Sequence, residues 1–261
     1  MRQKEDTLIL CRYLERGKGV FVQSVVSRFA VKKGESDIHV VWDTRRNGVN
    51  ERLWAPHFFL PGSENLEQLL TMDSFQGDMD VGEMFLNFML HFSERKHFGV
   101  RYFTTDKEGN DMEKITRFRC LMFGSKCSPF AAIKMMYRAL EQILGDHTDP
   151  KNVFTWEKVN LNLPGDPKYN PALPWMSKIT PEGKIAPDSV FYFGNGRAVV
   201  FSEESCKQAL QQMASILNWL GISRCCTQTM TSHETTRSLG RSSHRYICYQ
   251  PYNILIQRQV V

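Results

Sequence analysis

Short blocks of apolar residues separated by polar ones recur along this chain, and the clearest of them spans residues 190–201. Two runs of β-branched and aromatic residues lie on either side of Gly194, Asn195 and Gly196. Glycine and asparagine tolerate the positive φ angles of a tight turn. The pattern therefore predicts a β-hairpin with its tip at these three residues.

Similar alternation predicts more strands. We expect two further hairpins, formed by residues 29–34 with 38–43 around a polar turn, and by residues 99–105 with 115–123 around a turn at 106–110. Residues 77–81 also favour a strand, on which Asp78 and Asp80 point the same way because side chains alternate. Gly82 then permits a turn into a helix that carries Phe85, Phe88 and Met89.

Helical spacing of apolar residues predicts the other elements. Ser128 and Ser202 are the expected caps of two long helices that end at Gly145 and Gly221. Shorter helices are expected over residues 5–16 and 65–72. Between the long helices, residues 150–187 are rich in Pro, Gly and Asn and read as a long excursion with two short strands.

The composition of the 261 residues, 42% hydrophobic and 23% charged, is that of a globular chain. No apolar run of about 18 residues exists, and the start of the chain is too charged for a signal peptide, so we expect an intracellular protein, cytoplasmic or nuclear, without a membrane partner. Seven cysteines without a Cys-x-x-Cys pair indicate reduced thiols.

The last forty residues, 222–261, differ in character and hold five arginines and one acidic residue. We expect a poorly defined tail. A zinc site is the alternative, but the gaps between its Cys and His residues match no usual ligand pair; the candidates are Cys225, Cys226, His233, His244 and Cys248.

Two groups of charged residues can each be interpreted in two ways, as a binding site or as an ordinary structural feature. Asp78 and Asp80 suit Mg²⁺, which takes oxygen ligands, or merely begin a helix; a calcium loop fails because Met89 stands where its bidentate Glu belongs. Lys32 and Lys33 with Arg45 and Arg46 form either a solvated face or a site for phosphate oxygens. The local pattern leaves these alternatives open.

In order, these segments resemble the fingers and palm of a reverse transcriptase (RNA-directed DNA polymerase) from a retrotransposon polyprotein, similar to elements of algae and other microbial eukaryotes. The resemblance covers about residues 20–223. It rests on residues 29–33 with 41–45, on residues 80–85, on residues 118–130, and on Tyr192-Phe-Gly-Asn195, which stands where the family has Tyr-x-Asp-Asp.

This resemblance implies roles for single residues. Asp80 would be the catalytic aspartate and ligand of Mg²⁺ or Mn²⁺, with Asp78 as a second candidate ligand, and Phe85 would exclude a ribose 2′-hydroxyl. The nucleotide-binding residues that it implies are Lys33, His39, Arg45, Phe85, Phe123 and Gly124. The implied partners are an RNA or DNA template–primer and a deoxynucleoside triphosphate.

Three departures from the family pattern bear on activity. His39 replaces an arginine, and no thumb is recognisable after Gly221. Gly194 and Asn195 occupy both aspartate positions of the hairpin, and two-metal phosphoryl transfer needs carboxylates on both sides of the cations. Glu203 and Glu204 belong to the first turn of the next helix and cannot replace them.

The expected fold is therefore α+β, a right-hand polymerase fingers and palm with an antiparallel palm sheet backed by helices and no thumb. The expected regions are a helical lead (1–19), fingers-like strands (20–76), a palm-like region (77–221) with its insertion (150–187), and the tail (222–261). We expect a catalytically impaired reverse-transcriptase-like domain. The alternatives are a non-catalytic nucleic-acid-binding remnant and a decayed open reading frame.

Overall fold

The computed structural model describes residues 13–15, 20–33, 37–60, 74–105, 108–171, 173–222, 246–249 and 254–258. It is a mixed α/β fold with small antiparallel sheets. The chain forms two compact units, one made of Met1–Phe58 with Met84–Met135 and the other of Phe59–Glu83 with Met136–Val261. This division places residues 84–135 with the first unit, whereas the sequence interpretation groups them with residues 77–221.

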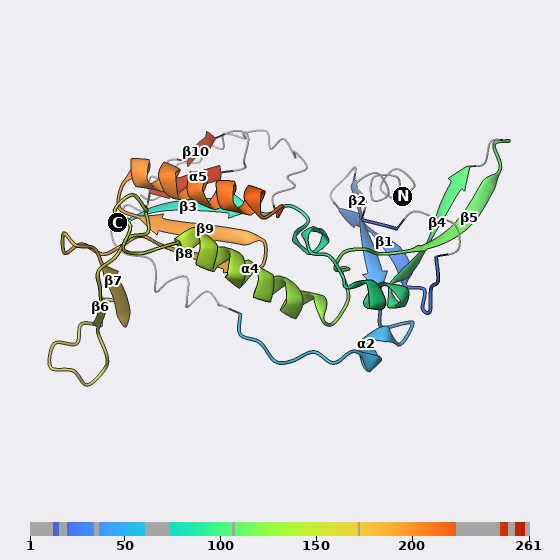
Figure 1. Ribbon diagram of the computed structural model, residues 1–261, viewed down its shortest axis with the longest axis horizontal. Coiled ribbons are helices and arrows are strands. Elements are labelled where there is room, and N and C mark those ends of the chain that lie inside the picture. The colour runs from blue at the N-terminus through green and yellow to red at the C-terminus, as the bar shows by residue number, and fades with distance from the viewer. Residues whose placement is uncertain are drawn as a thin grey trace. The chain divides into compact units, whose positions relative to one another are not determined.

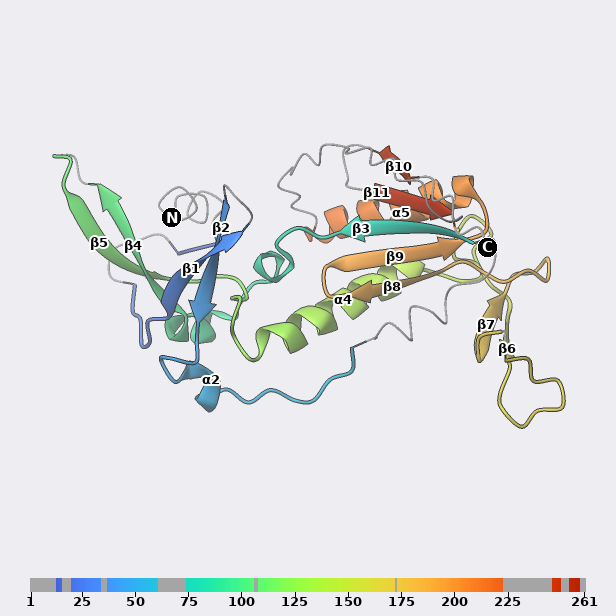
Figure 2. The same ribbon diagram turned by 180° about the vertical axis from the view of Figure 1, so that it is seen from behind.

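The first unit contains both hairpins expected before residue 124 (Figures 1 and 2). Strand β1 (Ser27–Lys33) pairs with β2 (Asp37–Asp43), and β4 (Gly99–Thr105) pairs with β5 (Asp111–Arg117), both antiparallel. The predicted return strand over 115–123 is wrong at its end. Arg117 already lies opposite Gly99, the first residue of β4, so β4 has no residues left to pair with those that follow.

Residues beyond β5 pair with other segments. Phe118 forms an isolated bridge with Leu14, and Cys120 forms one with Met89. The helix expected over residues 5–16 is therefore wrong in its described part, 13–15, which is extended; residues 1–12 lie outside the described residues. Because Met89 pairs with Cys120, its backbone does not continue a helix. The helix expected after Gly82 is therefore only the short 3₁₀ helix η1 (Met84–Asn87).

Apolar residues of these segments enclose one core in the first unit. Trp42 of β2 packs edge-on against Phe118, with ring centroids 5.1 Å apart. Further elements complete the unit, namely the short helix α2 (Val49–Arg52) and the 3₁₀ helix η2 (Phe92–His97). The buried members of the core come from all parts of the unit: Tyr13, Leu14, Val26, Trp42, Val49, Leu86, Phe98, Val100, Phe118, Cys120 and Met122.

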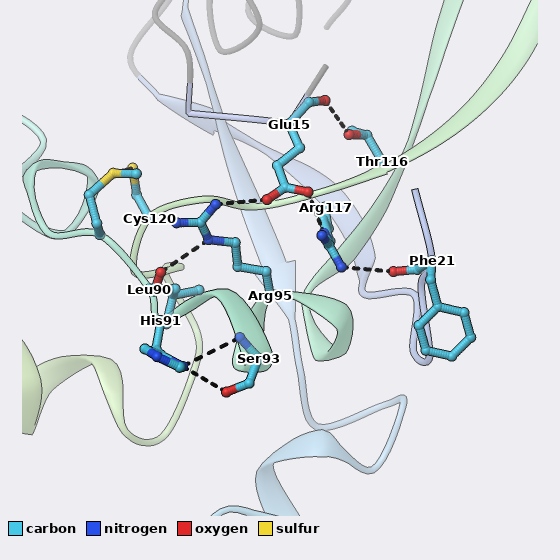
Figure 3. A network of polar contacts seen from close by, with 10 residues as sticks. Glu15, Phe21, Leu90, His91, Ser93, Arg95, Thr116, Arg117 and Cys120 are labelled. Carbon is cyan, nitrogen blue, oxygen red and sulfur yellow. Dashed lines mark hydrogen bonds and ion pairs between the residues drawn. The ribbon is translucent and has the colours of Figure 1, made fainter. Parts of the chain in front are cut away.

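Glu15 joins this core to two arginines (Figure 3). Its carboxylate accepts a hydrogen bond from Arg95 Nη1 at 2.8 Å and another from Arg117 Nε, and all three side chains are at most 15% exposed. Arg117 also donates to the carbonyl of Phe21, and its guanidinium lies 4.8 Å from the ring centroid of Phe92. The network ties the segment before β1 to β5 and η2.

The second unit is built on a sheet with the strand order β10-β11-β3-β9-β8. Its strands are β3 (Phe75–Asp80), β8 (Asp188–Tyr192), β9 (Asn195–Val200), β10 (Tyr246–Tyr249) and β11 (Ile254–Arg258). The expected hairpin at 190–201 is confirmed as β8 and β9. Its turn is Phe193–Gly194, because Tyr192 pairs with Asn195; Asn195 and Gly196 are strand residues.

The expectation of a poorly defined tail over 222–261 is wrong for residues 246–249 and 254–258, which form strands. β11 pairs with β3 along its length, from Ile254 opposite Met79 to Arg258 opposite Phe75. The backbone groups of β3 on that side need hydrogen-bond partners, and β11 supplies them. Four of the zinc candidates (Cys225, Cys226, His233, His244) and the helix expected over 65–72 lie outside the described residues.

Two helices lie on one side of this sheet (Figures 1 and 2). Helix α5 (Glu203–Trp219) begins as expected at Ser202, whose hydroxyl accepts a hydrogen bond from Ser205 N at 3.0 Å. Helix α4 (Ser128–Leu144) ends as expected before Gly145, which has φ 59°. Figures 1 and 2 show α5 and the later turns of α4 on the same side of β3, β9 and β8.

Gln212 of α5 donates to the carbonyl of Ile143 in α4 at 2.7 Å and so links the two helices. Leu220 follows Trp219, the last residue of α5, and is 38% exposed. The excursion 150–187 contains the two expected short strands, β6 (Lys158–Leu161) and β7 (Met176–Ile179), paired with each other. Among the described residues, no helix has the length and apolar character of a membrane span.

Gly196 lets α5 approach the sheet closely. A Cβ atom at this position would lie 2.5 Å from a ring carbon of Phe191 and 3.0 Å from the terminal methyl of Met213. We expect Gly196→Ala to lower the free energy of unfolding by about 1–3 kcal/mol, the usual cost of overpacking a core. Urea unfolding measures this, with Asn195→Ala as the control because the exposed Asn195 lies on the other face of the same strand. Equal losses in both variants would contradict the close approach.

Candidate functional site

The side of the sheet away from α5 carries polar residues at the end nearest the β8–β9 turn. Gly77 and Gly196 face α5, since a Cβ atom on either would meet side chains of that helix. Side chains alternate along a strand, so Asp78 and Asp80 of β3 with Asn195 and Arg197 of β9 face the other way. We call these four residues, together with Tyr192 of β8, the polar face.

The register of the strands sets the polar face out in rows. Asp80 lies directly opposite Asn195, which in turn lies opposite Tyr192. The backbone N–H of Val81 donates to the carbonyl of Gly194 at 2.7 Å and holds the end of β3 against the turn. The sequence interpretation places Asp80 beside the hairpin tip, and the structure brings these residues together.

Asp78 lies in the next row, opposite Arg197. Both oxygens of its carboxylate accept hydrogen bonds from the guanidinium, from Nε at 2.6 Å and from Nη2 at 3.0 Å. The two side chains are 34% and 31% exposed. Sequence reasoning missed Arg197, although the register would have revealed it: once Asp80 is placed opposite Asn195, Asp78 must fall opposite Arg197.

The donor set of the polar face does not fit the two divalent cations of a polymerase palm. Asp80 is the one carboxylate in the row at the turn, where Asn195 and Tyr192 contribute a neutral amide and a hydroxyl. Asp78, the second candidate ligand, already has a cationic partner. Within the described part of the chain, no group of three or more His, Cys, Asp or Glu side chains lies close enough to hold a metal ion.

The turn between β8 and β9 has an unusual backbone. Phe193 has φ 52°, a left-handed conformation in which a bulky side chain costs energy. Its ring packs edge-on against Tyr192, with centroids 5.2 Å apart. The positive φ falls on Phe193 and not on Gly194, the other residue of the turn. The pairing of Tyr192 with Asn195 leaves Asn195 and Gly196 in the strand.

The negative charge of Asp78 affects Cys206, which lies on the opposite side of the sheet. Burial, together with the negative charges of Asp78 and Glu203, raises the pKa of the Cys206 thiol in α5 to about 12. Cys206 packs against Gly77, so only a glycine backbone separates the thiol from the polar face. This cysteine is therefore a core residue without nucleophilic character at neutral pH.

Some of the predicted nucleotide-binding residues lie in the first unit. Phe85 and Phe123 contact each other edge-on, with ring centroids 4.9 Å apart. Gly124, next in sequence, has φ 90°, and its carbonyl accepts hydrogen bonds from Thr44 Oγ1 and from Asn50 Nδ2. The segment around Gly124 thus folds back onto the end of β2.

The basic residues of the first unit are only partly described. Arg45 follows β2 in a turn whose backbone N–H groups, at Arg45 and Arg46, donate to Asp43 Oδ1 at 3.0 and 3.1 Å. Lys33 is the last residue of β1, in register with Asp37, and His39 of β2 is in register with Val31. The side chains of Lys33 and His39 lie outside the described part, so their nucleotide contacts stay a prediction.

Comparison with known proteins bears on the fold. No protein-family model matches the chain, and no curated protein matches it either. Among solved structures, the chain is similar to a foamy viral protease–reverse transcriptase determined in complex with double-stranded DNA. The two are 15% identical, with a TM-score of 0.55 over 84% of this chain, which spans 29% of the length of the viral one. The likeness shows a reverse-transcriptase-like fold.

Proposed function

We propose that this chain is a reverse-transcriptase-like domain that binds nucleic acid and does not transfer nucleotides. The observation that carries the proposal is the row in which Asp80 faces Asn195 at a turn made by Phe193 and Gly194. Phosphoryl transfer by two cations needs carboxylates on both sides of the ions. The side opposite Asp80 has an amide and a glycine.

Neighbouring acids do not compensate for this loss. Glu203 and Glu204 are in the first turn of α5, on the other side of the sheet, where acidic residues favour the helix dipole. Glu203 is also paired with Lys207 at 3.0 Å. Asp78 is held by Arg197. Mg²⁺ or Mn²⁺, the cofactors of the family, would therefore find Asp80 as their single uncommitted carboxylate on the polar face among the described residues.

The binding half of the proposal draws on the fold and on the first unit. The viral neighbour was solved on double-stranded DNA, and the contact of Phe85 with Phe123 supports a common role for the motifs at 80–85 and 118–130. Lys33, His39 and Arg45 on the β1–β2 hairpin would contact a triphosphate or the nucleic-acid backbone, since cationic side chains suit phosphate oxygens.

Primer extension on a poly(rA) template with an oligo(dT) primer tests the catalytic half, first with Mg²⁺ and then with Mn²⁺. We expect no product from the native chain. The variant with Gly194→Asp and Asn195→Asp should extend the primer, because both substitutions place carboxylates beside Asp80. Extension by the native chain would overturn the proposal that it is inactive.

A salt titration of the native chain with the same primer–template tests the binding half. We expect affinity that falls as salt rises, with a slope that reports the number of phosphates contacted. Absence of binding at low salt would favour a domain that has lost both functions.

A further inference from the structure

Arg197 lies on the polar face, one row away from Asp80 and Asn195. We propose that Arg197 is an internal counter-ion, which supplies to Asp78 the positive charge that a bound divalent cation would otherwise supply. In the native chain, where Asp80 has no second free carboxylate beside it, the polar face therefore binds neither Mg²⁺ nor Mn²⁺. The missing hairpin carboxylates alone do not explain why two aspartates on one face of β3 do not act together as metal ligands. The proposal explains it.

The geometry of the pair carries the first step. Nε and Nη2 of Arg197 meet the two carboxylate oxygens of Asp78 at 2.6 and 3.0 Å, a side-on arrangement that uses the planar guanidinium fully. Both side chains are about one third exposed, so water screens them less than it would a surface pair. A cation that approached Asp78 would have to displace a charged donor fixed by the register of β3 and β9.

The charges of the polar face carry the second step. Asp78 and Arg197 cancel, which leaves one formal negative charge, that of Asp80, on the face. If Arg197 were neutral, Asp78 and Asp80 would give two carboxylates two residues apart on the same side of β3. That pair is the kind of oxygen ligand set that a divalent cation accepts while it keeps several waters.

A second consequence concerns nucleic acid, and it rests on the proposed function. If Arg197 satisfies Asp78, binding of a primer–template needs no divalent cation to shield this face from phosphates. The affinity of the native chain should therefore be the same in EDTA as in Mg²⁺ at equal ionic strength. Removing Asp78 alone should free the guanidinium for a phosphate and steepen the salt dependence by about 0.9, the value for one further phosphate contact.

The test of the first consequence is Mn²⁺ binding, followed by the electron paramagnetic resonance signal of free Mn²⁺ during titration. It needs no nucleic acid and no activity. We expect no saturable binding by the native chain, and binding at least about tenfold tighter by Arg197→Gln, because the number of free carboxylates sets affinity for such ions. The double variant Asp78→Asn with Arg197→Gln should return to native behaviour, and Arg197→Lys, which keeps the charge, should stay close to it.

Two results would overturn the proposal. Saturable Mn²⁺ binding by the native chain would show that Arg197 does not replace a cation. An Arg197→Gln variant that is folded, as judged by circular dichroism, and does not bind Mn²⁺ more tightly would show that Arg197 does not keep Asp78 from binding the cation. If Arg197→Gln does not fold, measurements on the native chain still test the proposal. Saturable Mn²⁺ binding, or a primer–template affinity that rises about tenfold when Mg²⁺ is added, would contradict it. The absence of both effects would support it.

The proposed function can fail separately. A native chain that binds no primer–template under any condition would remove the nucleic-acid consequence. The Mn²⁺ titration of the native chain and its variants would still decide whether Arg197 is an internal counter-ion.

Discussion

Gly124→Ala is expected to lower the free energy of unfolding by about 4 kcal/mol, or to prevent folding. Gly124 has φ 90°, and a Cβ atom there would lie 2.2 Å from the carbonyl oxygen of Trp42. The obstacle is backbone, which cannot rotate away as a side chain can. Moving it would also strain the hydrogen bonds from Thr44 and Asn50 to the carbonyl of Gly124.

Gly109→Ala is the matched control for this experiment. Gly109 has almost the same backbone conformation, φ 88°, but a Cβ atom there would meet nothing within 4 Å. Its substitution should cost only the strain of a positive φ, about 1–2 kcal/mol. Urea unfolding of both variants therefore separates strain from clash. A loss at Gly124 no larger than at Gly109 would show that residues 124 and 42 are not in close contact.

Glu15→Gln should lower the free energy of unfolding by about 3 kcal/mol at neutral pH, because it leaves two largely buried arginines without their common carboxylate. Arg95 and Arg117 are 15% and 10% exposed, so water replaces little of what they lose. Glu113→Gln is the control: it removes the partner of Arg101 in a pair 61% and 45% exposed. Exposed pairs contribute about 0–1 kcal/mol, so that variant should unfold almost like the native chain.

The effect of Glu15→Gln should depend on pH. Burial raises the pKa of Glu15, but hydrogen bonds from Arg95 and Arg117 and the charges of both outweigh it, so the pKa lies below its ordinary value. A carboxyl group with a lowered pKa stabilises the folded state above its unfolded pKa. This contribution is lost as pH falls through the folded pKa. The difference between native chain and variant should thus be full at pH 7 and shrink below about pH 4.5. A difference that grows on acidification would contradict the ion pair.

The network around Glu15 also illustrates what a sequence pattern misses. Residues 5–16 have the spacing of a short helix, yet residues 13–15 are extended, and Leu14 bridges to Phe118. Helical spacing over three turns is a weak preference, and pairing with a distant segment overrides it. No local signal links Glu15 with Arg95 and Arg117, because residues 80 and 102 positions apart meet only through the packing of the unit.

Local features of the sequence determined much of the second unit. Turn residues and β-branched runs predict the hairpin of β8 and β9, strand alternation puts Asp78 and Asp80 on one face, the Ser202 cap marks the start of α5, and glycines follow the ends of α4 and α5. Ser128, the expected cap of α4, is instead the first residue of that helix. These features depend on a few neighbouring residues, whose backbone preferences hold in any context. They do not bring Asp80 to the hairpin tip: the resemblance to reverse transcriptases implied that placement, and the pairing of Asp80 with Asn195 provides it.

Only the tertiary structure decided which side chains of those elements meet. The register of β3 against β9 pairs Asp78 with Arg197, and β11 becomes the other neighbour of β3 although it belongs to the supposed tail. The register of β8 against β9 places the turn at Phe193 and Gly194. Register depends on which residues fit across a strand pair and against α5, where Gly77 and Gly196 leave room for Cys206, Leu210 and Met213. The contacts of β3 with β9, β11 and α5 join residues more than a hundred positions apart, and a local pattern carries no information about them.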